Sequence, residues 1–138
     1  MPTASPRLYF ENGVGRLYGH PDGYALLRFN AGPRKFSDLQ ALLIQAGRLL
    51  ELHRWNRFLT DQRLLAPYTP AEVAWLVEHW CHAAAEYPAG LYGAVVMATN
   101  VFTRLAMGQI VQQANSAGMR FRRFETEAEA TAWLGQVG

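Results

Sequence analysis

An unbroken apolar run at residues 91–98 (LYGAVVMA) limits how this chain can fold more than any other stretch. It includes the β-branched pair Val95 and Val96 and shows no alternation between apolar and polar residues. Such a run is typical of a central strand that is covered on both faces. A strand of this kind needs helices on its two sides, so the run predicts an α/β fold.

The segment after this strand predicts a helix, a short strand and a second helix. Thr99 or Asn100 can cap a helix over VFTRLAMGQIVQQANSAG, and Gly118 stands where a residue with positive φ would end it. A strand at 119–124 and a helix over ETEAEATAWLGQ complete a β-α-β-α unit. A crossover of that length implies a parallel, right-handed connection.

The N-terminal part of the chain predicts three strands joined by turns. Asn12 and Gly13 can supply the positive φ of a type I′ hairpin, and PDG at 21–23 is a turn in which proline presets φ and glycine takes the left-handed position. We therefore expect a β-meander. Its strands lie at 7–12, 14–19 and 24–30.

A helix is predicted from Ser37 to about His53, because Ser37 and Gln40 have the spacing of a capping box. Its apolar residues recur at helical spacing and predict a face that covers the sheet. Gly47 lies inside this helix, where glycine is unfavourable, and we expect it to permit close packing on the sheet.

A fourth strand at 57–62 precedes another helix. Thr69 as N-cap, Pro70 at the first helical position and Glu72 completing a capping box predict the helix start, and the helix is expected to end near Tyr87. The fold class is therefore α/β: an N-terminal β-meander is followed by β-α repeats, and four helices cover a mixed sheet.

Length and composition fit one domain spanning residues 1–138, of which residues 1–5 are expected to form a flexible N-terminus. Half of the 138 residues are hydrophobic and 17% are charged, as in ordinary globular proteins. The formal net charge is only +2, and the arginines near residue 120 divide between the two faces of a short strand. We expect no nucleic-acid partner.

Cysteine content and hydropathy bear on the compartment. Cys81 is the only cysteine, which excludes an internal disulfide and a multi-cysteine zinc site and favours a reducing cytoplasm. The start of the chain lacks the pattern of a signal peptide, and no apolar run is long enough to span a bilayer. A cytoplasmic protein without membrane insertion is expected.

Candidate functional residues follow the fourth strand. Asp61 lies at its end, and the loop to Tyr68 and Thr69 leads into the next helix. Ligands of open sheets with parallel strands lie beyond the carboxyl ends of the strands, which favours this loop as a site. The alternative, that Asp61 and Thr69 only bond to neighbouring backbone, stays open.

The helix after Thr69 carries a second candidate surface. Its apolar stripe predicts that Glu72, Trp75, His79, His82 and Glu86 lie on the other side. His79, His82 and Glu86 have the spacing of a metal site, but no further ligand is apparent at a telling spacing. We favour a polar or subunit-contact surface anchored by Trp75, and we expect no metal and no other cofactor.

Signatures of catalysis are missing from the sequence. The glycines of ENGVGRLYG lie in hairpin turns rather than between a strand and a helix, so they do not form a phosphate loop. There is no nucleophile elbow, and Cys81 has no histidine facing it along the helix. A non-enzymatic role is expected.

The segment AVVMATNVFTRLAMGQIVQQANSAGMRFRRFETEAEATAWL resembles the C-terminal half of small bacterial STAS-like proteins, which are relatives of anti-sigma-factor antagonist domains and share a layout with CRAL-TRIO lipid-transfer modules. Upstream, FLTDQRLLAPYTPAE matches that family's strand ending in Asp, here Asp61. The likeness covers residues 24–135. The matching positions downstream are Asn100 at the strand end, Arg104 in the helix, Phe124, the acidic turn at 125–129 and the helix at 130–134.

This resemblance implies a STAS-like α/β sandwich with a regulatory or protein-binding role. One position departs from the family pattern. Antagonist domains carry a phosphorylated serine where this chain has Thr69 and Pro70, and Thr69 is expected to be occupied as a helix cap. The departure puts phosphorylation switching of the usual kind in doubt, although a phosphate would suit a helix N-terminus electrostatically.

We therefore expect a cytoplasmic regulatory or protein-interaction module that binds a protein partner or forms a homodimer. A binder of a small apolar molecule or lipid is the alternative, with Phe102, Trp80, Tyr87 and Phe121 lining a cavity. A metal-dependent or thiol enzyme is a third reading. The residues expected at the interaction site are Asp61, Tyr68, Thr69, Trp75, His79, His82, Asn100 and Arg104.

Overall fold

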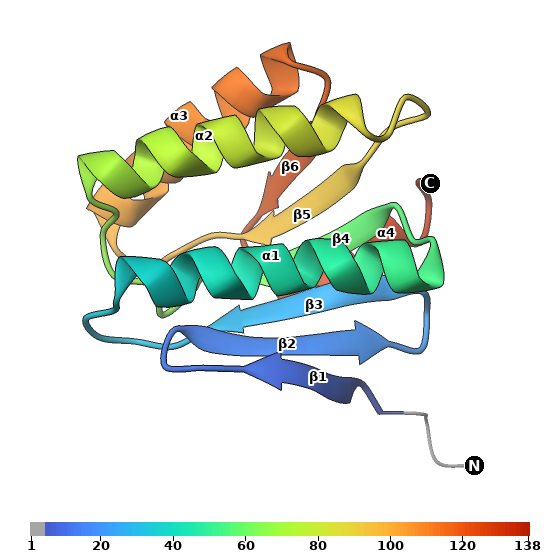
Figure 1. Ribbon diagram of the computed structural model, residues 1–138, viewed down its shortest axis with the longest axis horizontal. Coiled ribbons are helices and arrows are strands. Elements are labelled where there is room, and N and C mark those ends of the chain that lie inside the picture. Colours follow the sequence, from blue (N-terminus) through green and yellow to red (C-terminus); the bar gives the residue numbers. More distant parts are fainter. Residues whose placement is uncertain (1–4) are drawn as a thin grey trace.

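The structure, a computed structural model, describes residues 5–138. The expected order of elements is confirmed over this range (Figure 1). Residues 1–4 of the expected flexible N-terminus lie outside the described part. The elements are β1 (Arg7–Glu11), β2 (Gly15–His20), β3 (Tyr24–Phe29), α1 (Phe36–His53), β4 (Arg57–Asp61), α2 (Pro70–Ala85), β5 (Tyr92–Val96), α3 (Val101–Ser116), β6 (Arg120–Phe124) and α4 (Glu127–Leu134).

The strands form one sheet in which spatial order equals chain order, β1-β2-β3-β4-β5-β6. The first three strands pair antiparallel, and β3 to β6 pair parallel. The N-terminal meander therefore extends one edge of the sheet. Because each parallel connection advances in the same direction with the same hand, α1, α2 and α3 all cover one face.

The remaining helix, α4, packs on the opposite face, over β4, β5 and β6 (Figure 1). The apolar run in β5 contributes side chains to the cores on both faces of the sheet. Val95 belongs to the core under α1, α2 and α3, whereas Ala94 and Val96 face Ala130 and Leu134 of α4. The prediction of a strand covered on both faces is confirmed, and the alternation of the pleat assigns its residues to the two cores.

An aromatic cluster fills the larger core above β5. Phe58 stacks on Trp80 with ring centroids 4.7 Å apart, and Phe121 meets both rings edge-on. Gly93 lies beneath them, and a Cβ atom there would come within 2.5 Å of Phe58 and 2.7 Å of Phe121. The glycine therefore makes room for the rings.

Several local predictions are confirmed. Thr69 and Glu72 form the capping box of α2, with Pro70 in the first turn. Asn100 caps α3 by accepting from the backbone N–H groups of Phe102 and Thr103, and Gly118 has a φ of +111° after the end of this helix.

The first hairpin differs from the prediction. Gly13 does not have a positive φ, so no type I′ turn forms. The connection between β1 and β2 has three residues, 12–14. The Asn12 side chain shapes it by accepting a hydrogen bond from the Val14 N–H at 2.9 Å and donating one to the Asp38 carbonyl at 2.8 Å. Hydrogen bonds of the Asn12 side chain, one within the turn and one to α1, thus shape the connection in place of a positive φ at Gly13.

The start of α1 also differs. The helix begins at Phe36 and its N-cap is Lys35, which makes no side-chain capping bond. The amides of Asp38 and Leu39 bond to the Lys35 carbonyl, so Ser37 already lies inside the first turn and cannot cap it. The prediction that Gly47 permits close packing on the sheet is also wrong, because a Cβ atom there would meet nothing within 4 Å.

Among residues 5–138, no helix combines the length and the apolar character needed to cross a bilayer.

Candidate functional site

The carboxyl ends of β3, β4, β5 and β6 meet at one edge of the sheet, hereafter the carboxyl edge. The loops that leave these strands lie there with the N-termini of the helices that follow. Two of the predicted residues, Asp61 and Asn100, stand at this edge, and Arg104 reaches it from the first turn of α3.

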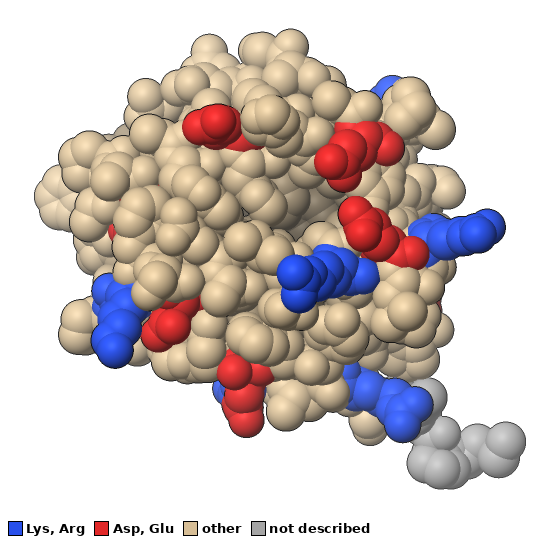
Figure 2. Space-filling view, in the orientation of Figure 1, with Lys and Arg blue, Asp and Glu red and all other residues tan. Residues whose placement is uncertain are grey.

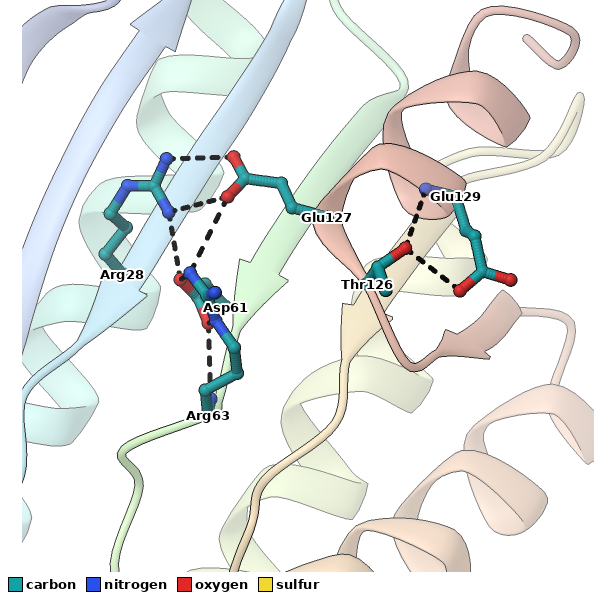
Figure 3. Close-up of polar contacts among 6 residues, drawn as sticks. All are labelled: Arg28, Asp61, Arg63, Thr126, Glu127 and Glu129. Carbon is teal, nitrogen blue, oxygen red and sulfur yellow. Dashed lines mark hydrogen bonds and ion pairs between the residues drawn. The ribbon is translucent and has the colours of Figure 1, made fainter.

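Asp61 is the centre of an ion-pair network (Figure 3). Arg28 of β3 donates to an Asp61 carboxylate oxygen at 2.9 Å and holds Glu127 of α4 with two hydrogen bonds of 2.8 and 3.0 Å. Arg63 binds both Asp61 oxygens, through Nε at 2.9 Å and Nη2 at 2.7 Å. The network connects β3, β4 and the β4–α2 loop to α4, the helix on the opposite face of the sheet from α1, α2 and α3.

The charges within this network balance. Burial would raise the pKa of Asp61, but hydrogen bonds and charge from Arg63 and Arg28 outweigh it and hold the pKa below its usual value. Both carboxylates are engaged by guanidinium groups, and Asp61 is only 7% exposed. Asp61 accepts one neighbouring backbone N–H, that of Arg63 at 3.2 Å, but its other partners are arginine side chains, so its contacts go beyond the bonds to backbone that the alternative describes.

Asn100 and Arg104 fasten the neighbouring connections. Asn100 is occupied as the cap of α3. Arg104 donates to the Ala98 carbonyl at 3.2 Å and to Glu125 at 2.8 Å. The hydrogen bonds from Arg104 lower the pKa of the exposed Glu125 carboxyl. Arg104 therefore holds the β5–α3 and β6–α4 connections beside each other, and Asn100 fixes the start of α3.

Two further bonds fix the loop after β4. The Thr99 N–H and hydroxyl both donate to the Arg63 carbonyl, and the buried Thr103 hydroxyl donates to the Leu65 carbonyl at 3.0 Å. Leu64 lies between these two anchored residues with 63% of its surface exposed. The loop is therefore held against the start of α3 with Leu64 pointing into solvent.

Three more large apolar side chains are exposed on the first turns of α3, the helix to which the Leu64 loop is bonded. Val101, Phe102 and Leu105 are 58%, 67% and 68% exposed. We call Leu64, Val101, Phe102 and Leu105 the apolar patch. The sequence analysis did not predict this exposed patch. Apolar residues on more than one side of the α3 sequence indicated it.

Tyr68 and Thr69 lie where the β4–α2 loop enters α2. Thr69 is engaged as the cap, and the Tyr68 hydroxyl is 3.4 Å from Gln62 Oε1. Burial raises the pKa of the Tyr68 hydroxyl. Arg34 stacks over the Tyr68 ring and binds the Glu72 carboxylate with two hydrogen bonds of 2.7 and 2.8 Å. Glu72 is buried, so its predicted place on the outer face of α2 is wrong.

Trp75, His79 and His82 follow one another along α2 but differ in exposure. Trp75 is half-buried against Phe36 of α1, and His79 stacks on it at 4.8 Å. Burial, and secondarily the charge of His82, lower the pKa of His79 to about 4, so its ring is neutral at pH 7. His82 is exposed, 3.8 Å from Glu78.

The four aromatic residues expected to line a ligand cavity do not line one cavity together. Trp80 and Phe121 pack within the core, and Phe102 is exposed on α3. Trp80 and Tyr87 both line a groove between α1 and α2. The void beside Trp80 and Phe121 measures about 10 Å³, which is too small for a ligand. Within residues 5–138, no three His, Cys, Asp or Glu side chains are grouped to hold a metal ion.

No family model, no curated protein and no solved structure matches this chain.

Proposed function

We propose that the protein is a non-enzymatic protein-interaction module and that the apolar patch at the carboxyl edge is its docking surface. The observation that carries this proposal is the patch itself: four large apolar side chains, each more than half exposed, on the β4–α2 loop and on the first turns of α3, which is bonded to that loop. Exposed apolar clusters with polar surroundings are typical of protein interfaces.

The surroundings of the patch support the same function. Arg63 and the Arg104–Glu125 pair supply a charged rim. The anchoring of Leu64 between bonded residues and the capping of α3 fix the patch before a partner arrives, which lowers the entropy cost of binding. A rigid apolar centre inside a polar rim is the arrangement found at binding hot spots.

An uncharged groove between α2 and α3 extends this surface. It has a volume of about 510 Å³ and includes Pro70, Val77, Gln109 and Gln113. In Figure 2 the upper left of the molecule, over the N-terminal half of α2, carries few charged side chains. A partner seated on the patch could extend along this groove without burying an unpaired charge.

A STAS-like relationship and a cytoplasmic location belong to this proposal. The β-α order on which the resemblance rests is also the order of the elements in the fold. The single cysteine supports a reducing compartment. Thr69 is taken up as a helix cap, so we do not include phosphorylation of Thr69 in the mechanism.

The test compares two patch variants with an exposed apolar residue elsewhere. Phe102→Glu and Leu105→Glu place a charge in the patch, whereas Leu52→Glu changes a residue of α1 that is 65% exposed. Proteins cross-linked to the tagged chain in its own host are quantified. The molar mass of the purified chain is measured by light scattering to detect a homodimer. We expect the affinity of the patch variants for the specific partner, or for a second copy of the chain, to fall by about 30-fold, as for a hot-spot residue.

Unfolding midpoints of all three variants must equal that of the natural chain, since these side chains are exposed. Equal recovery of partners with the Phe102 and Leu52 variants would overturn the proposal. We replace Phe102 and Leu105 rather than Trp75 because Trp75 also packs on Phe36, so its loss would disturb the fold.

A further inference from the structure

A groove lies at the other end of the sheet, where β2 ends and α1 finishes. Its volume is about 480 Å³, within the range of small-molecule sites. The groove is open to solvent and is separate from the apolar patch, because none of its residues lies at the carboxyl edge. Its lining residues are Ser5, Arg7, Leu8, Tyr9, Gly19, His20, Pro21, Leu49, His53 and Trp55.

Aromatic and aliphatic side chains build the groove walls. Trp55 stacks on His53 with ring centroids 4.2 Å apart, and it lies above Gly19, where a Cβ atom would be 3.5 Å from the indole ring. Leu49 is buried beneath, and Leu8 is half exposed at the rim. These flat and apolar surfaces suit a planar apolar group.

The ionisable groups of the lining, apart from the Tyr9 phenol, are all basic: Arg7, His20 and His53. Within residues 5–138, the Arg7 guanidinium forms neither an ion pair nor a side-chain hydrogen bond, so its donors are free. His20 does not face the Trp55 wall of the groove, because its ring stacks on Tyr24 of the smaller core, on the other face of the sheet from Trp55 and Leu49. The Asp22 carboxylate, 3.7 Å from His20 Nδ1, is 71% exposed and is not part of the lining.

We propose that this groove binds an aromatic carboxylate. The ring of the ligand lies against Trp55 and Leu49, and its carboxylate is held by Arg7. An arginine fork matches the two oxygens of a carboxylate, and such charge-assisted bonds are about twice as strong as neutral ones. The site is independent of the proposed docking surface, so either can fail alone.

The test uses 2-naphthoate as the probe and its neutral amide, 2-naphthamide, as the matched control. The whole chain is titrated with each compound while the indole N–H signals of its four tryptophans are recorded by NMR. The signal that Trp55→Phe removes is assigned to Trp55. We expect this signal to shift with a saturable curve for naphthoate and about tenfold weaker binding for the amide.

Two arginine variants separate the site from general charge attraction. Arg7→Gln is expected to weaken naphthoate binding about tenfold, and Arg122→Gln, on the exposed opposite edge of the sheet, is expected to leave it unchanged. Equal affinity for the acid and the amide, an equal loss in both variants, or shifts that spread over all four indoles without saturation would overturn the proposal.

Discussion

Gly93 in β5 and Gly47 in α1 differ in the space that a Cβ atom would find, and this difference determines whether glycine is needed at each position. Gly93 lies under the aromatic cluster, where the rings of Phe58 and Phe121 occupy the space of a side chain. Gly47 in α1 has nothing within 4 Å of the position a Cβ would take. The same residue type is therefore required by packing in β5 and unfavourable in α1.

Gly47→Ala is expected to stabilise the protein by about 0.5–1 kcal/mol, because alanine loses less backbone entropy in a helix and meets no neighbour. Gly93→Ala is expected to destabilise it by about 1–3 kcal/mol through overpacking. Urea unfolding of both variants measures the two effects. A stabilising Gly93→Ala would show that the aromatic rings can move aside freely.

At the scale of elements, side chains from loops and helix ends connect the layers. The Arg34–Glu72 pair joins the segment before α1 to the first turn of α2, with side-chain exposures of only 7% and 4%. Glu72 also accepts the Thr69 N–H, so one carboxylate serves the cap and the tertiary contact together. On the other face, Glu127 joins α4 to Arg28 of β3.

Glu72→Gln is expected to cost about 3 kcal/mol or more, because it leaves the Arg34 guanidinium buried without its counter-ion. The matched control is Glu78→Gln on the exposed side of the same helix, with a change within about 0.5 kcal/mol. Denaturant unfolding measures both. If the Glu72→Gln variant fails to fold, Arg34→Met with Glu72→Met is expected to regain part of the loss. Equal stability of the Glu72→Gln and Glu78→Gln variants would contradict the assignment.

At the scale of the whole molecule, surface charges and an irregular strand protect the two edges of the sheet, and buried carboxylates set its response to acid. The edge strand β6 exposes Arg120, Arg122 and Arg123, and the opposite edge strand β1 is irregular between Leu8 and Phe10. Charges and bulges of this kind prevent edge-to-edge pairing. These three arginines are therefore solvated charges on an edge strand.

Acid is expected to destabilise the fold through its two buried carboxylates. Burial would raise the pKa values of Asp61 and Glu72, but their arginine partners lower them below the usual 3.8 and 4.5. Folding therefore favours the ionised forms. Their stabilisation is present above about pH 4.5 and is lost as the pH falls through the lowered values of the folded chain.

Unfolding free energies between pH 7 and pH 3 measure this dependence, and Asp61→Asn is expected to make the curve less steep. A carboxyl NMR titration of the folded chain provides a second measurement that does not depend on the variant. Titration of Asp61 and Glu72 at or above their usual values would contradict the expectation.

The local sequence determined much of the fold. Caps and turn residues act within a few neighbours, so Thr69, Asn100 and Gly118 identified helix ends correctly. The apolar run in β5 identified the central strand because burial on both faces removes alternation. The local reading was wrong at Gly13 and Ser37, where the Asn12–Asp38 contact and an earlier helix start replaced the expected turn and cap.

The candidate sites were decided by tertiary structure. Asp61 was identified at the end of its strand, but its partner Arg28, and Glu127 which Arg28 also binds, come from positions far along the chain, and only the strand order and the crossing of α4 to the other face bring them together. Leu64 is held beside the start of α3 because Thr99 and Thr103 anchor the loop, and Arg7 lines the same groove as Trp55 only through the pairing of β1 with β2. The sequence determined the elements because period and capping are local properties, and the tertiary structure decided the surfaces because side chains distant in sequence meet only after the elements pack.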